Sequence, residues 1–173
     1  MCGGRSGTVG EGMKYLLFLG VPLFALDQLT KWLVRKEIGY GSEIPIVPGF
    51  FSLVHASNTG AAFSIFTGYN FFFIALALGA LAFIAFLLIR HHRTKIDGRR
   101  LTTLTQISFA LLASGILGNL VDRLLRGAVT DFLYFYVRQY SWPSFNVADS
   151  CICVAAGLLI LGSLQKPATA KKR

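Results

Sequence analysis

The chain has 173 residues, about the length of one domain. Hydrophobic residues make up 54% and charged residues 14%, against about 25% charged residues in soluble domains, which excludes a disordered chain, a coiled coil and a collagen-like chain. The net charge of +9 suggests nucleic-acid binding until the location of the charges is known. The three cysteines, Cys2, Cys151 and Cys153, are an odd number and argue against a disulfide framework.

Four apolar segments follow one another along the chain, at about 15–35, 70–90, 101–124 and 146–164. The second is uncharged from Phe71 to Ile89. At about 1.5 Å per residue, such a helix covers roughly 30 Å, the thickness of the hydrocarbon core of a bilayer. A buried helix of a soluble protein is the alternative for this segment alone. The four segments together predict four transmembrane helices, because each can pair its backbone internally.

Four spans place both chain ends on the same side of the membrane. This side holds Lys14, the basic loop at 90–100 and the tail at 166–173, whereas the charges on the other side cancel. The positive-inside rule makes the basic side cytoplasmic. The basic charge then reflects topology and contact with anionic lipid, and no nucleic-acid partner is expected.

Two loops lie on the other, outer side. The loop at 37–70 contains a strand-like segment at 50–54. The loop at 126–145 is rich in aromatic residues, which we interpret mainly as an interfacial aromatic belt. Residues 1–13 are expected to be a flexible N-terminal tail, and 166–173 a basic cytoplasmic tail.

Polar residues gather at the outer ends of the spans, where an ionisable group is by default a functional hypothesis. Asp27 and Lys31 lie four residues apart on one face of the first span. Taken alone, they are explained more simply as a local ion pair worth a few tenths of a kcal/mol. The segment at 58–64, NTGAAFS, contains Gly60 and is suited to close approach of a bound peptide strand. An ordinary turn into the second span is the alternative.

The third span ends in SGILGNLVDR. Gly115 and Gly118 allow tight helix contact, and Asn119, Asp122 and Arg123 share one face. An interfacial Asp122–Arg123 pair, with the arginine reaching outward, is the alternative to a functional site.

Asp131 lies in the second outer loop, and Asn146 and Asp149 begin the fourth span. If the two carboxyl groups face each other, they share a proton, and such a pair can take a proton from water and give one to a leaving amine. The alternative for Asp149 is a capping box with Asn146. Few His or Cys side chains at this face could serve as zinc ligands, so no metal is expected.

Five of these clusters, in this order, resemble the signal peptidase II family, the lipoprotein signal peptidases. The matching segments are DQLTK at 27–31, NTGAAFS at 58–64, GILGNLVDR at 115–123, VTDF at 129–132 and FNVAD at 145–149. The resemblance extends from about Tyr15 to Leu164, nearly the whole chain.

This resemblance implies an all-α membrane protein of four transmembrane helices. A small β-sheet, formed largely by the 37–70 loop, and a short helix in the second outer loop would lie on the outer (periplasmic) face. Residues 14–165 would form a single peptidase domain. The implied activity is that of an aspartic endopeptidase of the bacterial cytoplasmic membrane, which cuts prolipoproteins just before the diacylglyceryl-modified cysteine. No cofactor is implied, and the expected partners are these prolipoproteins and membrane lipid, with the enzyme monomeric.

The family's catalytic pair falls on Asp131 and Asp149. Its supporting residues fall on Asp27, Lys31, Asn58, Gly60, Asn119, Asp122, Arg123, Asn146 and Ala148. The three asparagines are expected to orient the peptide and the pair, and Arg123 to pair with Asp122.

Two rival classes remain. A proton-coupled carrier would place carboxylates near the bilayer midplane and show similar halves, whereas here they cluster at one face and no repeat is visible. A structural or assembly factor would tolerate the loss of both carboxylates.

Overall fold

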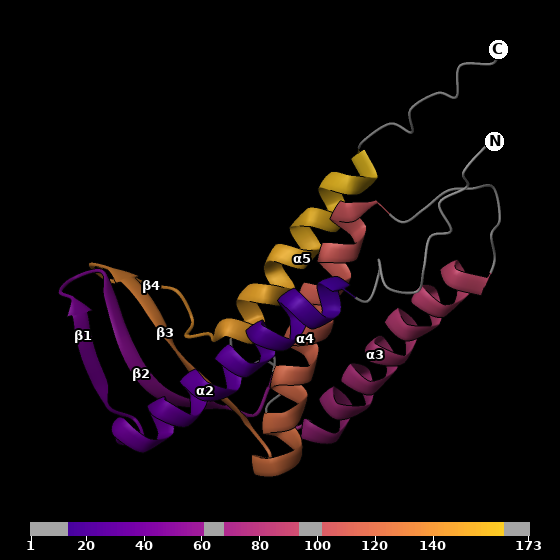
Figure 1. Ribbon diagram of the computed structural model, residues 1–173. Helices are drawn as coiled ribbons and strands as arrows, with labels where there is room; N and C mark the ends of the chain where they lie inside the picture. Colours follow the sequence, from indigo (N-terminus) through magenta and orange to yellow (C-terminus); the bar gives the residue numbers. More distant parts are fainter. Residues whose placement is uncertain (1–13, 61–67, 94–101, 165–173) are drawn as a thin grey trace, which may run out of the picture.

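The computed structural model describes residues 14–60, 68–93 and 102–164 (Figure 1). A short π-helical segment leads directly into the first α-helix. The elements in chain order are η1 (Leu16–Gly20), α2 (Val21–Glu37), β1 (Glu43–Val47), β2 (Phe51–Asn58), α3 (Asn70–Arg93), α4 (Thr103–Arg126), β3 (Val129–Val137), β4 (Tyr140–Ser141) and α5 (Val147–Leu164). The tails at 1–13 and 166–173 and the motif residues 61–64 lie outside the described residues.

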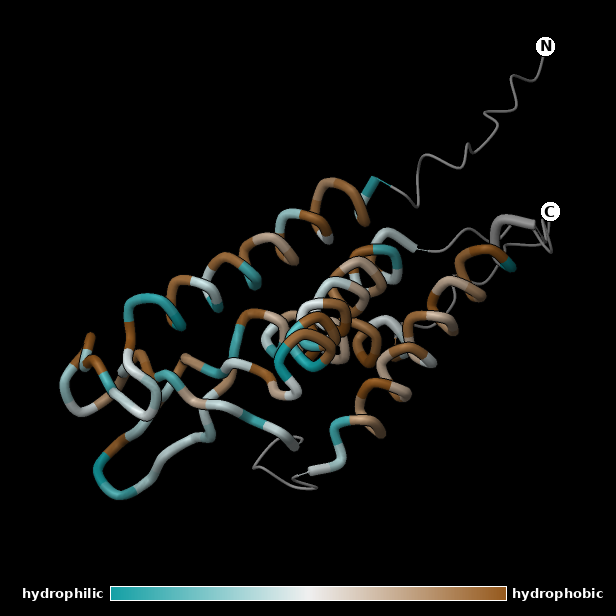
Figure 2. Tube along the Cα trace, turned by 90° about the horizontal axis from the view of Figure 1, so that it is seen from below, coloured by the Kyte–Doolittle hydropathy of each residue, from teal (hydrophilic) through white to brown (hydrophobic). Residues whose placement is uncertain are grey.

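Four helical segments are long and apolar enough to cross a membrane: Leu16–Glu37, Asn70–Arg90, Thr103–Arg126 and Val147–Leu164. They confirm the predicted number of spanning helices. Figure 2 shows apolar residues along the helices and polar residues near the ends where they meet the sheet. Only 6% of the most apolar stretch of α3 is buried, so this helix presents most of its surface to its surroundings.

The central helix is α4, which packs against η1, α2, α3 and α5. Its N-cap is Thr102, whose hydroxyl accepts a hydrogen bond from the N–H of Thr105 (3.1 Å). Its C-cap is Gly127, whose φ of 74° is the left-handed conformation that favours glycine. On its α5 side, Gly115 leaves no space for a Cβ, which would collide with the carbonyl oxygen of Ala148. Close packing of α4 on α5 therefore depends on small residues.

The four strands form one antiparallel sheet in the order β1-β2-β3-β4. The sheet corrects two expectations, since the protein is not all-α and the 126–145 loop supplies two strands rather than a short helix. The segment Val129–Val137, VTDFLYFYV, is rich in β-branched and aromatic residues and pairs with β2 along its length. The 37–70 loop therefore provides only half of the strands.

The sheet is joined to the bundle at the end where α2 and α4 finish and α5 begins (Figure 1). Val34 and Ile38 at the end of α2 pack with Phe132 of β3 in a buried cluster, and Leu53 and Val147 pack against it. This contact fixes β3 against the helices, so the first residues of β3 have defined positions beside α4 and α5.

Candidate active site

Asp131 lies near the start of β3, where it is opposite Ala56 of β2, and is only 2% exposed. Its Oδ1 accepts a hydrogen bond from Asn146 Nδ2 (2.7 Å), and its Oδ2 accepts one from Asn58 Nδ2 (3.1 Å). Residues from β2 and from the start of α5 thus hold this carboxyl group.

Asp149 lies in the first turn of α5, where a carboxylate suits the positive end of the helix dipole. Its Oδ1 accepts a hydrogen bond from Asn119 Nδ2 (2.7 Å) and its Oδ2 from the N–H of Asn146 (3.2 Å). In return, the N–H of Asp149 donates to Asn146 Oδ1 (3.0 Å). The reciprocal cap expected as the structural alternative is therefore present. Because Asn146 also binds Asp131, one residue brings both carboxyl groups together.

Each of the three asparagines is held with its amide nitrogen toward a carboxyl group. The Oδ1 of Asn58 accepts a hydrogen bond from the N–H of Gly60 (2.9 Å). The Oδ1 of Asn119 accepts one from the ammonium group of Lys31 (2.9 Å). An amide whose oxygen is bound to a donor is fixed in orientation. The donors around Asp131 and Asp149 are therefore preorganised.

Lys31 is fully buried, at 0% exposure. Its ammonium lies 2.9 Å from Asp27 Oδ2 and 3.4 Å from Asp122 Oδ2. Asp27 in turn accepts the N–H of Ala148 (2.8 Å), one of the free donors at the start of α5. The predicted Asp27–Lys31 ion pair is thus present, but it belongs to a buried network that joins α2, α4 and α5.

Asp122 and Arg123 do not form the expected pair. Asp122 Oδ2 accepts the N–H of Thr130 (3.1 Å), which ties β3 to α4, whereas Arg123 Nη2 donates to the carbonyl oxygen of Gly60 (2.8 Å). The Arg123 guanidinium also lies over the ring of Phe73 in α3, 4.7 Å from its centroid. The expectation was wrong because adjacent residues of a helix point in different directions.

Sequence reasoning missed Arg35 and Thr130. Arg35 Nη1 donates to Thr130 Oγ1 (3.0 Å) and lies 3.5 Å from Asp122 Oδ1. The available signal was spacing, since Arg35 follows Lys31 by four residues on the same face of α2.

The pKa of Asp131 is raised from its ordinary value of 3.8 to about 7, with burial as the largest cause and the nearby charge of Asp149 acting in the same direction. Hydrogen bonds from Asn58 and Asn146 and the charge of Lys31 lower this pKa in part. A carboxyl group with a pKa near neutrality can both hold and release a proton, as general acid–base chemistry requires.

Replacing Gly118 with alanine is expected to destabilise the protein by about 1–3 kcal/mol and to reduce its activity. The added Cβ would lie 2.5 Å from Asp27 Oδ2 and 3.1 Å from the Cβ of Ala148, so it would push Asp27 away from its partners. Thermal unfolding in detergent measures the effect. Gly79→Ala, where a Cβ meets nothing within 4 Å, is the matched control and should leave stability almost unchanged. Equal effects of the two substitutions would contradict this prediction.

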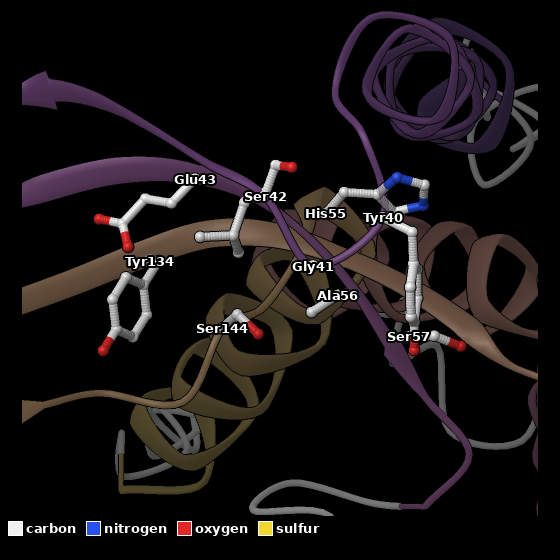
Figure 3. A pocket seen from close by; sticks show the side chains of 10 residues that line it. Tyr40, Gly41, Ser42, Glu43, His55, Ala56, Ser57, Tyr134 and Ser144 are labelled. Carbon is white, nitrogen blue, oxygen red and sulfur yellow. The ribbon is translucent and has the colours of Figure 1, made fainter.

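A pocket of about 420 Å³ lies elsewhere on the sheet, beside β1, β2 and β3. Figure 3 shows its lining, which includes Glu43, His55 and Tyr134. Among the described residues that line it, none is a predicted site residue. The predicted residues instead converge around the two carboxyl groups.

Known proteins resemble this chain in sequence and in fold. The sequence model of the family described as "Signal peptidase (SPase) II" matches residues 19–165. The lipoprotein signal peptidase of Ralstonia nicotianae is 45% identical over 168 residues, covering 95% of this chain and 91% of that protein. Those of Symbiobacterium thermophilum and Geobacter metallireducens are 42% and 43% identical, covering 84% and 88% of this chain and 91% and 93% of those proteins.

A solved structure described as a bacterial membrane enzyme superposes with a TM-score of 0.79 at 28% identity, covering 91% of this chain and 92% of that one. Fold, family model and relatives agree over nearly the whole length. The chain therefore belongs to the signal peptidase II family.

Proposed function

We propose that this chain is an aspartic endopeptidase of the bacterial cytoplasmic membrane. It removes the signal peptide from diacylglyceryl-modified prolipoproteins by cutting just before the lipidated cysteine. Membership of the signal peptidase II family and bacterial relatives named lipoprotein signal peptidase support the activity. The observation that carries the assignment of the site is the contact of one residue, Asn146, with both Asp131 and Asp149.

The two aspartates act on a water molecule held between them. The ionised carboxylate takes a proton from water as the oxygen attacks the scissile carbonyl carbon. The protonated carboxyl group then gives its proton to the leaving amine of the cysteine as the C–N bond breaks. Asp131, with its pKa near neutrality, carries the shared proton before the reaction. Asn58, Asn119 and Asn146 keep both carboxyl groups oriented, and no covalent intermediate or cofactor is needed.

The site lies at the outer face of the membrane, with both termini in the cytoplasm. The excess of Lys and Arg at the chain ends and in the 90–100 loop supports this orientation through the positive-inside rule. The apolar stretch of the signal peptide and the two acyl chains then lie in lipid beside the bundle. The scissile bond sits at the interface, level with the end of α4 and the start of α5. The enzyme acts as a monomer and has no nucleic-acid partner.

Activity is expected to fall as the pH rises through about 7, because Asp131 then loses the proton that the leaving amine requires. The same raised pKa affects stability. Between 3.8 and about 7 the folded state binds the proton more tightly than the unfolded state, so the free energy of unfolding falls as pH rises through this window. Cleavage rates from acidic to alkaline pH test the prediction on activity. Thermal unfolding over the same pH range tests the prediction on stability. An Asp131→Asn protein that kept the full stability decline would contradict the role of this residue.

Purified protein in detergent, incubated with a diacylglyceryl-modified prolipoprotein and with its unmodified precursor, tests the function itself. A gel shift of the lipidated precursor alone is the expected result. Cleavage of both precursors would show that the enzyme does not require the lipid on its substrate. No cleavage by well-folded protein would contradict the proposed activity, and proton flux in liposomes would then test the carrier class.

A further inference from the structure

The first turn of α3 contacts Arg123, which lies near the end of α4; Figure 1 shows these two helix ends side by side. Asn70 Nδ2 donates a hydrogen bond to the backbone carbonyl oxygen of Arg123 (3.3 Å). The guanidinium carbon of Arg123 lies over the ring of Phe73, 4.7 Å from its centroid. Asn70 and Phe73 are close to one turn apart and therefore share one face of α3. This face holds both the backbone and the side chain of Arg123.

The guanidinium of Arg123 connects this turn of α3 to Asp131 through a chain of hydrogen bonds. Its Nη2 donates to the carbonyl oxygen of Gly60 (2.8 Å). The N–H of Gly60 donates to Asn58 Oδ1 (2.9 Å), and Asn58 Nδ2 donates to Asp131 Oδ2 (3.1 Å). Each contact orients the next group, because an amide with one end bound cannot turn freely. The position of the guanidinium therefore affects the donor that holds the Asp131 carboxyl group.

Hydrogen bonds alone do not fix this guanidinium. Its Nη1 is buried and has no hydrogen-bond partner among the described residues, so the bond to Gly60 leaves the group free to turn about that contact. The charges of Asp149 and Asp131 attract it, yet Arg123 forms no ion pair with either one in the part of the chain that the structure describes. The face of the Phe73 ring, which carries the negative part of the aromatic quadrupole, supplies the missing constraint.

A direct ion pair between this arginine and the site would oppose the proposed chemistry. The charged groups that act near Asp131 are Asp149 of α5, Lys31 of α2 and Arg123 of α4, whereas β2 contributes the uncharged amide of Asn58. A cation brought into contact with a carboxyl group lowers its pKa, so Asp131 would lose the proton that the leaving amine requires. The guanidinium would also occupy carboxylate oxygens that must bind water. The site therefore needs this cation close by but held away from the carboxyl groups.

We propose that Phe73 is a positioning residue of the active site, whose ring holds the Arg123 guanidinium on Gly60 and away from the two catalytic carboxyl groups. Phe73 acts through Arg123 and does not touch the reacting atoms. The helix α3 thus contributes to the site, although none of the predicted site residues belongs to it. This inference rests on the proposed peptidase function, because its effect is on cleavage.

Phe73→Leu tests the proposal, because leucine keeps an apolar side chain but removes the ring. We expect kcat for a lipidated precursor to fall about tenfold, while KM changes by less than about twofold. The decline of activity on the alkaline side should move about one pH unit lower, since the freed guanidinium approaches Asp131. Phe73→Tyr retains the face of the ring and should restore the wild-type kcat and pH profile.

A trifluorinated phenylalanine at position 73 separates the charge distribution of the ring from its shape. The fluorine atoms withdraw electron density from the ring face and weaken its attraction for a cation, while the size of the side chain changes little. We expect a kcat between those of wild type and Phe73→Leu. A wild-type kcat and pH profile would show that Phe73 only fills space, and would overturn the proposal even if Phe73→Leu failed to fold.

The matched control is Phe71→Leu, which removes a ring from the same turn of α3. Phe71 is 82% exposed, so this variant should keep the wild-type kcat and pH profile. Equal losses in Phe71→Leu and Phe73→Leu would assign the effect to α3 as a whole and overturn the proposal. Wild-type protein that cleaves normally, with an unchanged Phe73→Leu variant, would contradict this inference alone. No cleavage by well-folded wild type would instead contradict the proposed function.

Discussion

Substituting asparagine for either Asp131 or Asp149 is expected to lower the cleavage rate by at least about a thousandfold and to leave the fold intact. Asparagine has almost the same shape as aspartate but can neither take a proton from water nor return one to the leaving amine. Single-turnover cleavage of a lipidated precursor measures the rate, and thermal unfolding in detergent measures the fold.

The matched control for this pair is Glu43→Gln, which removes an exposed carboxylate from the same sheet and should keep nearly full activity. Substantial cleavage by one of the two aspartate variants would remove that residue from the catalytic pair. Full activity in both would favour a structural or assembly factor.

Removing the buried cation is expected to have the largest effect on stability, with Lys31→Met lowering the free energy of unfolding by about 3–5 kcal/mol. Methionine leaves the carboxylates of Asp27 and Asp122 buried without their shared ammonium, and it frees the amide of Asn119 to turn. Denaturation in detergent, followed by circular dichroism, measures the change.

Lys36→Met is the control for that experiment. Lys36 belongs to the same helix and pairs with Glu37, but both side chains are about 60% exposed, and such surface pairs are worth about 1 kcal/mol or less. A loss for Lys31→Met no greater than that for Lys36→Met would show that the network does not stabilise the fold.

The spanning helices could be predicted from sequence because hydropathy summed over a helix is a local property. The segment 129–137 could not be assigned in the same way. Its aromatic residues are equally typical of an interfacial belt and of a strand, and only the pairing of β3 with β2 distinguishes them. The strands of the 126–145 loop were therefore missed.

The candidate site, too, could be predicted from the sequence only in part. The motif positions Asp131, Asn146 and Asp149 were predicted and lie together. The link from Lys31 through Asn119 to Asp149 joins three helices, and the bond from Arg123 to Gly60 joins α4 to the end of β2. Such contacts between distant segments have no signature in the spacing of residues.

The contact of Asn146 with both carboxyl groups has a consequence for biogenesis. Asn146 and Asp149 begin the last helix, α5, so a growing chain that has not yet reached this helix has only one member of the pair. The hydrogen-bond network of Asp27, Asn119 and Asn146 is completed when the start of α5 docks on α4. The proposed mechanism therefore predicts that nascent chains are proteolytically silent until the final span has been inserted into the membrane.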